Sequence, residues 1–286
     1  MKINIIDSLS DLGRGIYRYP IKVFVYAFSC FSVILTIIRG IDYLVPGIQI
    51  QGINSLIAVV AVSVFYSLKK VWKPSGIEIK VAHSSTVIEV LFGDLFEQNG
   101  IRALAVNEFF DSKIGKPVSD KSLHGIFLQR CLGGHPEAFD KQVDEELKNI
   151  EFREIAKRDG KSKSFPIGST ALILANDEKY LVFALSKTDP ESCKASSDVT
   201  MMWDSLHKLW QRAREEAGGH ELNLPLVGSG LSGLGLPTRD LLNLIILSAI
   251  TETKAREITQ IIRVVLHRSR FDDLDLRDVK KHWEEK

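Results

Sequence analysis

Two long apolar runs near the N-terminus constrain the fold of this chain more than any other feature of its sequence. Residues 23–38 and 53–68 contain no charged side chain and are rich in valine, isoleucine, leucine, phenylalanine and alanine. Each run falls slightly short of the ~20 residues that a helix needs to cross a bilayer, so flanking residues must contribute. We therefore predict two transmembrane helices, over residues 21–40 and 51–69. The alternatives are a buried helical hairpin and a cleaved signal peptide, and the second apolar run argues against a signal peptide.

The basic residues around these runs predict their orientation. Those outside the connector are Arg14, Arg18, Lys22, Lys69, Lys70 and Lys73. The connector has only Arg39, whose charge Asp42 balances. Because the cytoplasmic flanks of membrane helices are enriched in lysine and arginine, both termini are predicted to be cytoplasmic. Residues 1–75 then form a membrane segment, and residues 76–286 form a cytosolic domain.

Composition excludes several classes of protein. The chain has 286 residues and a formal net charge of +1, so no overall positive field favours nucleic acid. Its three cysteines are widely separated and odd in number, which is typical of a reducing compartment rather than of a disulfide framework. The histidines and cysteines lack the spacing of zinc ligands. We therefore expect no nucleic-acid partner and no metal site.

Strand-like and helix-like blocks alternate from residue 76 onward. The strand-like segments cover residues 77–81, 86–92, 101–106, 171–175, 180–185, 222–227 and 258–266. Helical periodicity covers residues 139–155, 201–217, 239–253 and the end of the chain from residue 275. The turn at residues 176–178 predicts a hairpin. Together these blocks predict a mixed α/β domain with helices on both faces of its sheet.

A glycine-rich segment, residues 225–237, follows one of the predicted strands. It contains Gly228, Gly230, Gly233 and Gly235, and a predicted helix begins just after it. Glycines let backbone N–H groups converge on an anion, and the first turn of a helix adds the positive end of its dipole. We predict a phosphate-binding loop. The alternatives are a flexible surface loop and a Rossmann dinucleotide site, but the late position of the segment argues against the Rossmann site.

Two polar residues lie at the ends of other predicted strands. Asp94 follows the strand that ends at residue 92, and its carboxylate can accept a hydrogen bond from the exocyclic amine of adenine. The alternative for Asp94 is an N-cap of the short helical stretch that follows it. Asn107 directly follows the strand at residues 101–106, and its amide can bind a ribose hydroxyl. The alternative for Asn107 is a turn-forming asparagine.

Taken in order, these motifs resemble those of the macrodomain family, a three-layer α/β/α fold with a mixed sheet that binds ADP-ribose. The resemblance covers residues 76–286. It implies that Asp94 holds the adenine amino group with support from the Leu95 backbone, and that Asn107 approaches the distal ribose. It also implies that the diphosphate is wrapped by Gly228, Ser229, Gly230, Leu231, Ser232, Gly233 and Leu234.

The segment after Asn107 departs from the pattern of that family. Catalytic members have a second asparagine followed by a run of glycines, whereas this chain has Phe110 and no such run. We therefore expect a binding domain without catalytic residues or a cofactor. Candidates for contact with a group attached to ADP-ribose are Glu108, Asp111, Ser122 and His124, and Phe110 is a further ligand-binding candidate. The alternatives are solvated loop charges for the two carboxylates and a surface or capping role for the histidine.

The whole chain resembles the membrane-bound macrodomain effectors of bacterial Thoeris antiphage systems. The resemblance rests on two spans before a divergent macrodomain, and on the sequences Asn-Glu-Phe-Phe-Asp at 107–111 and Ser-Leu-His-Gly at 122–125. It implies a multi-pass protein of the bacterial inner membrane that binds an ADP-ribose derivative, such as histidine-ADP-ribose, made by a TIR-domain protein. Homo-oligomerisation, membrane disruption and abortive infection would follow. The alternatives are a membrane-tethered ADP-ribosyl hydrolase and a passive ADP-ribose reader.

Overall fold

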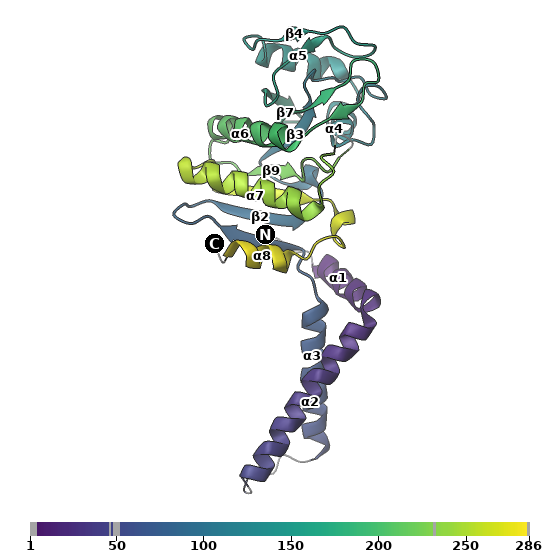
Figure 1. Ribbon diagram of the computed structural model, residues 1–286, viewed down its shortest axis with the longest axis vertical. Coiled ribbons are helices and arrows are strands. Elements are labelled where there is room, and N and C mark those ends of the chain that lie inside the picture. Colours follow the sequence, from purple (N-terminus) through teal and green to yellow (C-terminus); the bar gives the residue numbers. More distant parts are fainter. Residues whose placement is uncertain (1–4, 46, 48–51, 231–232, 285–286) are drawn as a thin grey trace. The chain divides into compact units, whose positions relative to one another are not determined.

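The computed structural model describes residues 5–45, 47, 52–230 and 233–284 (Figure 1). The chain divides into two compact units. One comprises Met1–Ser75 with Asp275–Arg277, and the other comprises Gly76–Leu274 with Asp278–Lys286. The first unit carries both apolar runs, and the second carries all the predicted strands.

The first unit is built from three helices. They are α1 (Ile5–Arg18), α2 (Pro20–Leu44) and α3 (Ile53–Val71). The two long apolar helices α2 and α3 lie side by side as a hairpin (Figure 1). Each is long and apolar enough, by length and composition, to cross a membrane. The structure therefore agrees with two apolar helices at the predicted places, although α2 extends to Leu44 and the predicted position 51 lies outside the described residues. Helix α1 was not predicted.

The surfaces of α2 and α3 differ from those of core helices. None of the described residues of α2 is buried. The buried residues of α3 recur every four positions and form one stripe: Val59, Ser63, Ser67 and Val71. The hydroxyl of Ser67 donates to the carbonyl of Val23 on α2 at 2.6 Å, a contact of the kind that joins helices in a bilayer. Helix α2 is therefore not a buried core helix among the described residues, and its crossing of a membrane stays a prediction.

The second unit is built on an eight-stranded mixed sheet in the order β1-β2-β10-β9-β3-β7-β6, with β8 paired to β7. Its strands are β1 (Gly76–Lys80), β2 (Val87–Phe92), β3 (Ile101–Asn107), β6 (Thr170–Ala175), β7 (Glu178–Thr188), β8 (Ala195–Ser196), β9 (Leu222–Pro225) and β10 (Ile261–Leu266). Strands β2, β10, β9, β3 and β7 are mutually parallel, whereas β1, β6 and β8 pair antiparallel. A separate two-stranded sheet joins β4 (Arg153–Glu154) to β5 (Lys163–Ser164).

Helices cover both faces of this sheet. They are α4 (Leu123–Leu132), α5 (Pro136–Glu146), α6 (Val199–Glu216), α7 (Thr238–Ala255) and α8 (Leu276–Glu284), with 3-10 turns η1 (Leu95–Glu97) and η2 (Arg268–Arg270). Tyr180, Val182 and Ala184 of β7 share a core with Phe127 of α4 and Phe139 of α5. The intervening residues of β7 point to the other face, because side chains alternate along a strand. There α6 packs on β7 and on α7, which gives the predicted three layers (Figure 1).

The predicted strands and the helices near 201–217 and 239–253 are confirmed within a few residues. The helix predicted over 139–155 is wrong, because α5 ends at Glu146 and Arg153–Glu154 form a strand. Two consecutive glutamates, Glu145 and Glu146, end α5, and negative charge at a helix C-terminus opposes the helix dipole. Helix α4 was not predicted, although Ser122 caps its first turn and Gly133 ends it with a left-handed φ of 62°.

Candidate ligand-binding site

The candidate residues gather at one edge of the sheet because they follow parallel strands. The carboxyl ends of β2, β10, β9, β3 and β7 succeed one another along that edge. Asp94 follows β2, the glycine-rich loop follows β9, and Asn107 ends β3. Ligands of open α/β sheets bind at this kind of edge. The structure thus brings the three motifs together in a row.

Asp94 is both an N-cap and half of an ion pair. Its Oδ1 accepts from the backbone N–H of Phe96 at 2.9 Å, so the N-cap alternative is confirmed. Its Oδ2 lies 2.6 Å from a guanidinium nitrogen of Arg130 on α4, and both side chains remain partly exposed. Partial burial acts to raise the pKa of Asp94, but the hydrogen bonds from Arg130 and Phe96 outweigh it and lower the pKa below its usual value. Asp94 is therefore an ionised acceptor that solvent reaches, and its contact with adenine stays a prediction.

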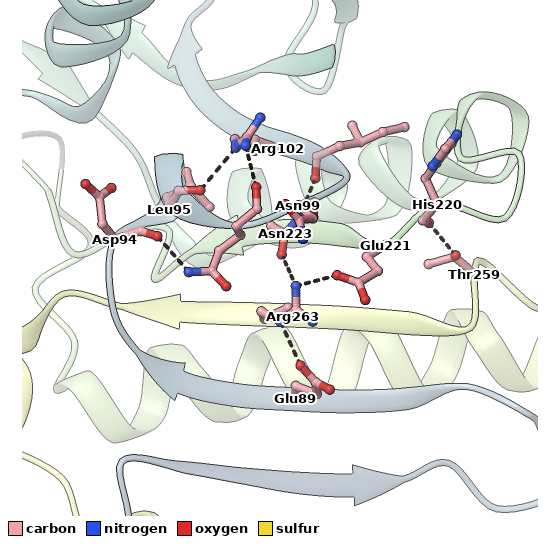
Figure 2. Close-up of polar contacts among 12 residues, drawn as sticks. Glu89, Asp94, Leu95, Asn99, Arg102, His220, Glu221, Asn223, Thr259 and Arg263 are labelled. Atoms are coloured by element: carbon pink, nitrogen blue, oxygen red, sulfur yellow. Dashed lines mark hydrogen bonds and ion pairs between the residues drawn. The ribbon is translucent and has the colours of Figure 1, made fainter. Parts of the chain in front are cut away.

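Arg102 on β3 holds the short loop that carries Asp94 (Figure 2). Its Nε donates to the carbonyl of Leu95 at 3.3 Å, and another guanidinium nitrogen donates to the carbonyl of Gln98. The Gln98 amide in turn donates to the carbonyl of Asp94 at 2.9 Å. Glu178 balances the charge of Arg102 at 2.8 Å. These bonds tie the backbone of Asp94 to the sheet.

A buried polar network on the sheet supports the same loop from below (Figure 2). Arg263 of β10 donates to Glu89 of β2 at 2.7 Å, to Glu221 at 2.6 Å and to Asn223 of β9 at 2.8 Å. The Asn223 amide donates onward to the carbonyl of Asn99 at 2.6 Å. Arg263, Glu89 and Asn223 are all buried. Three strands and the loop are therefore joined by hydrogen bonds that are buried or partly buried.

The glycine-rich loop turns tightly where β9 ends. Gly228 has a positive φ of 81°, and a Cβ at this position would lie 2.6 Å from the Leu234 side chain. The N–H of Leu234 donates to the carbonyl of Gly228 at 3.1 Å, and the Ser229 hydroxyl donates to that of Leu226 at 2.6 Å. Gly230, in contrast, is exposed, and among the described residues beyond its chain neighbours no atom lies within 4 Å of the place of a Cβ. The loop thus closes on itself from Gly228 to Leu234.

The first turn of α7 has no side-chain cap. Its N-cap is Pro237, which supplies no side-chain hydrogen bond to the first turn. The first N–H groups of a helix lack partners within the helix, so an uncapped N-terminus favours an anion. The predicted site residues Leu231 and Ser232 lie outside the described residues.

Asn107 and Asp111 lock the end of β3. The Asn107 amide donates to Asp111 Oδ2 at 2.8 Å, and the Asp111 N–H donates back to Asn107 Oδ1 at 3.1 Å. Asp111 also forms a fully buried ion pair with Lys157. Its Oδ1 accepts a hydrogen bond from the backbone N–H of Lys161 at 2.7 Å. The alternative of a solvated loop charge is therefore wrong for Asp111. Its carboxylate is fully buried and holds the loop.

Phe110 and His124 lie inside the domain. Phe110 is fully buried with a φ of 49° and meets Phe165 edge-on, with ring centroids 5.8 Å apart. His124 is buried at the start of α4, so the alternative of a surface histidine is wrong. Burial, reinforced by the charge of Lys161, lowers the pKa of His124 to about 3. Its imidazole is therefore neutral, and Nε2 has no hydrogen-bond partner among the described residues.

Glu108 contacts Thr188 beside the end of β3, and we call this pair of residues the Glu108–Thr188 corner. Its Oε1 accepts from the Thr188 N–H at 2.9 Å, while Oε2 and the Thr188 hydroxyl are buried without a partner in the described part of the chain. Glu108 is 6% exposed, so it too is not a solvated charge. Burial raises the pKa of Glu108 above its usual value. In this corner, Glu108 Oε2 can therefore accept a further hydrogen bond.

Sequence reasoning missed four residues that shape this edge: Arg102, Arg130, Lys157 and Thr188. Arg130 lies 36 positions from Asp94 and Lys157 lies 46 positions from Asp111. No local pattern marks such pairs. The cap residues of α4 were the one available signal, because they place Arg130 in the last turn of a helix that packs beside β3.

Comparisons with known proteins bear on the second unit. Residues 88–267 match the model of the family described as Thoeris protein ThsA, Macro domain. No curated protein matches the chain. A mutant of the Oceanobacillus iheyensis macrodomain with ADPR aligns with a TM-score of 0.52 at 12% identity, over 74% of this chain and 100% of that chain. The same macrodomain with ADP gives 0.51 at 12% identity, over 74% and 98%. The fold is therefore that of a macrodomain, and the Rossmann alternative is wrong.

Proposed function

The chain belongs to the family of the Thoeris protein ThsA macrodomain, and from this premise we propose that it is a membrane-anchored antiphage effector. In this proposal its macrodomain binds an ADP-ribose derivative made by a TIR-domain protein of the same system. Binding then drives the chains to assemble, and the assembled α2–α3 hairpins disrupt the inner membrane in abortive infection. The domain acts as a receptor and not as an enzyme.

The order of the motifs along the sheet edge is the observation that supports an ADP-ribose-type ligand. The motifs follow one another along the edge as Asp94 after β2, the glycine-rich loop after β9 and Asn107 at the end of β3. This is the order of the adenine, the diphosphate and the distal ribose in ADP-ribose. With β10 lying between β2 and β9, the row spans three strand spacings, roughly 14 Å. Such a row fits an elongated ligand with a base at one end and a sugar at the other. Solved macrodomains of the same fold carry ADP and ADPR.

The Glu108–Thr188 corner supports a conjugate of ADP-ribose, rather than free ADP-ribose, as the ligand. It lies beyond Asn107, at the end of the row where the distal ribose is proposed to lie. A buried carboxylate oxygen without a partner is unfavourable unless a donor reaches it. The α-amino or imidazole group of histidine-ADP-ribose is such a donor. We propose that Glu108 accepts from this group and so distinguishes the conjugate from ADP-ribose.

The apolar hairpin supports the membrane part of the proposal. Residues of α2 are exposed along its whole length, and these include Phe24, Phe28, Val33 and Ile37. Large apolar surface of this extent is stable only against lipid or another protein. The flanking basic residues favour a cytoplasmic location for both termini. The macrodomain then faces the compartment in which a TIR enzyme consumes NAD.

Dye release from vesicles tests the whole proposal. The full chain is reconstituted into calcein-loaded vesicles of phosphatidylethanolamine and phosphatidylglycerol, and histidine-ADP-ribose, ADP-ribose or NAD is added. We expect release with the histidine conjugate, weaker release with ADP-ribose and none with NAD. Asp94→Asn should raise the ligand concentration needed for release roughly 10-fold to 100-fold. Asp177→Asn should leave it unchanged, because Asp177 lies in the turn before β7 at the opposite edge of the sheet.

Two other outcomes would contradict the proposal. If no ligand releases dye although it binds, the chain is a passive reader. If the recovered ligand has been cleaved, the domain is an ADP-ribosyl hydrolase. A specific test of the conjugate corner is Glu108→Gln, which should weaken binding of histidine-ADP-ribose and leave the binding of ADP-ribose unchanged.

A further inference from the structure

Helix α1 exposes two large apolar side chains, Leu9 and Ile16. Leu9, Leu12 and Ile16 recur at spacings of three and four and therefore share one helix face. The exposed fractions of Leu9 and Ile16 are 59% and 37%, and that of Tyr17 beside them is 90%. A helix on the surface of a soluble domain turns such a face inward.

The opposite face of α1 is the packed one. Asp11 and Gly15 lie one turn apart on that face, and Asp11 is only 1% exposed. A Cβ at Gly15 would lie 2.8 Å from the backbone oxygen of Val71, so the glycine lets α1 approach the end of α3 closely. The polar Asp11 is therefore more buried than the apolar Leu9 and Ile16, which is the reverse of the usual arrangement.

Helix α1 lies at the basic end of the α2–α3 hairpin. It leads directly into α2, because the N–H of Tyr19 still donates to the carbonyl of Gly15 at 3.1 Å and Pro20 begins the next helix. The ammonium of Lys22 lies 4.6 Å from the centre of the Tyr19 ring. At the same end, α3 finishes with Lys69 and Lys70. Tyrosine and lysine are the residues that concentrate where a membrane helix meets the headgroups.

We propose that α1 lies in the plane of the membrane as an interfacial helix, with the lipid headgroup region as the partner of its exposed face. Leu9, Leu12 and Ile16 would enter the boundary between headgroups and acyl chains to a depth of ~5–10 Å. The basic residues at this end attract anionic lipid. This inference rests on the proposed insertion of α2 and α3, because α1 leads directly into α2.

Nitroxide labels test this placement in the full chain. The native cysteines Cys30, Cys131 and Cys193 are free and are replaced by alanine. Single labels are then introduced at Leu9 and Ile16 on the apolar face, and at Ser10 as the matched control on the polar flank. The protein is reconstituted into vesicles of phosphatidylcholine and phosphatidylglycerol, and collisions of each label with oxygen and with a water-soluble nickel complex are measured.

We expect the labels at Leu9→Cys and Ile16→Cys to collide mainly with oxygen, as lipid-facing sites do, and Ser10→Cys to collide mainly with nickel. Equal nickel accessibility at all three positions overturns the inference. Reference labels at Val33 of α2 and Val60 of α3 separate the two proposals. If these references are lipid-exposed while Leu9 and Ile16 are not, only the interfacial helix fails. If the references are also open to nickel, the membrane insertion fails.

Discussion

Asp94 and its neighbours define the ligand end of the molecule at the scale of single residues. The position of Asp94 could be predicted because it follows a strand and precedes a helical turn, and both facts are local. Its partner Arg130 could not, since it belongs to a helix far along the chain. Phe110, Asp111 and His124 were predicted as site residues, but the structure shows all three buried. Burial depends on the loops that cover a side chain, and a single sequence does not contain that information.

Asp94→Asn tests the adenine contact with almost no change of shape. The substitution removes the charge that strengthens a hydrogen bond from the exocyclic amine, and a charge-assisted bond contributes about 1.5–3 kcal/mol. We expect the affinity for ADP-ribose, measured by calorimetry, to fall roughly 10-fold to 100-fold.

The matched control for this change is Arg130→Gln. It also breaks the Asp94–Arg130 ion pair but leaves the carboxylate free to accept. Affinity should therefore be retained or rise. If both variants lose affinity equally, the ion pair matters and not the adenine contact.

His124→Phe tests the buried neutral imidazole. The folded-state pKa of about 3 lies below the ordinary value of 6.5, so only the unfolded chain takes up this proton as the pH falls below 6.5. The free energy of unfolding of the natural chain should then drop by roughly 1.6 kcal/mol more than that of the variant between pH 6.5 and 5. Urea unfolding at several pH values measures the difference. Parallel pH profiles would contradict the burial of this ring.

At the scale of elements, most of the architecture could be predicted because strands and long helices have periodic apolar patterns. The alternation along β7 and the period of α6 are examples, since both elements are buried on well-defined faces. The helix over 139–155 was overextended, because its pattern does not reveal that β4 and β5 pair with each other. The short strands have no pattern of their own. They form only because distant residues provide their partners.

Arg263→Met tests the network beneath the Asp94 loop. The change leaves the buried carboxylate of Glu89 without its cation, and removing one partner of a buried ion pair destabilises a protein by about 3–5 kcal/mol. Urea unfolding should show a loss of this size. The control Arg270→Met breaks an exposed ion pair with Asp273 and should change stability by less than ~1 kcal/mol. Similar losses in the two variants would mean that the network is not buried.

Gly230→Ala tests the close approach of a ligand to the loop after β9. The new methyl group meets no atom of the described residues outside its immediate chain neighbours, so the melting temperature should not change. If the diphosphate lies against the backbone here, the methyl group obstructs it and the affinity for ADP-ribose falls. Unchanged affinity would mean that the diphosphate does not approach this part of the loop.

The whole molecule joins a macrodomain to a pair of long apolar helices. The division near residue 75 was expected from the change in composition. The way in which ligand binding acts on the helices follows neither from the apolar runs nor from the strand and helix pattern of the second unit. A ligand shifts an equilibrium only by its difference in affinity for the two states. The proposed effector therefore requires the signal to bind the assembled form more tightly than the resting form.

The most direct test of the central claim is a calorimetric titration of the full chain, held in lipid nanodiscs, with histidine-ADP-ribose, ADP-ribose and NAD. The account predicts that the histidine conjugate binds most tightly, that ADP-ribose binds more weakly, and that NAD binds least. Binding of none of the three, or tightest binding of NAD, would contradict it.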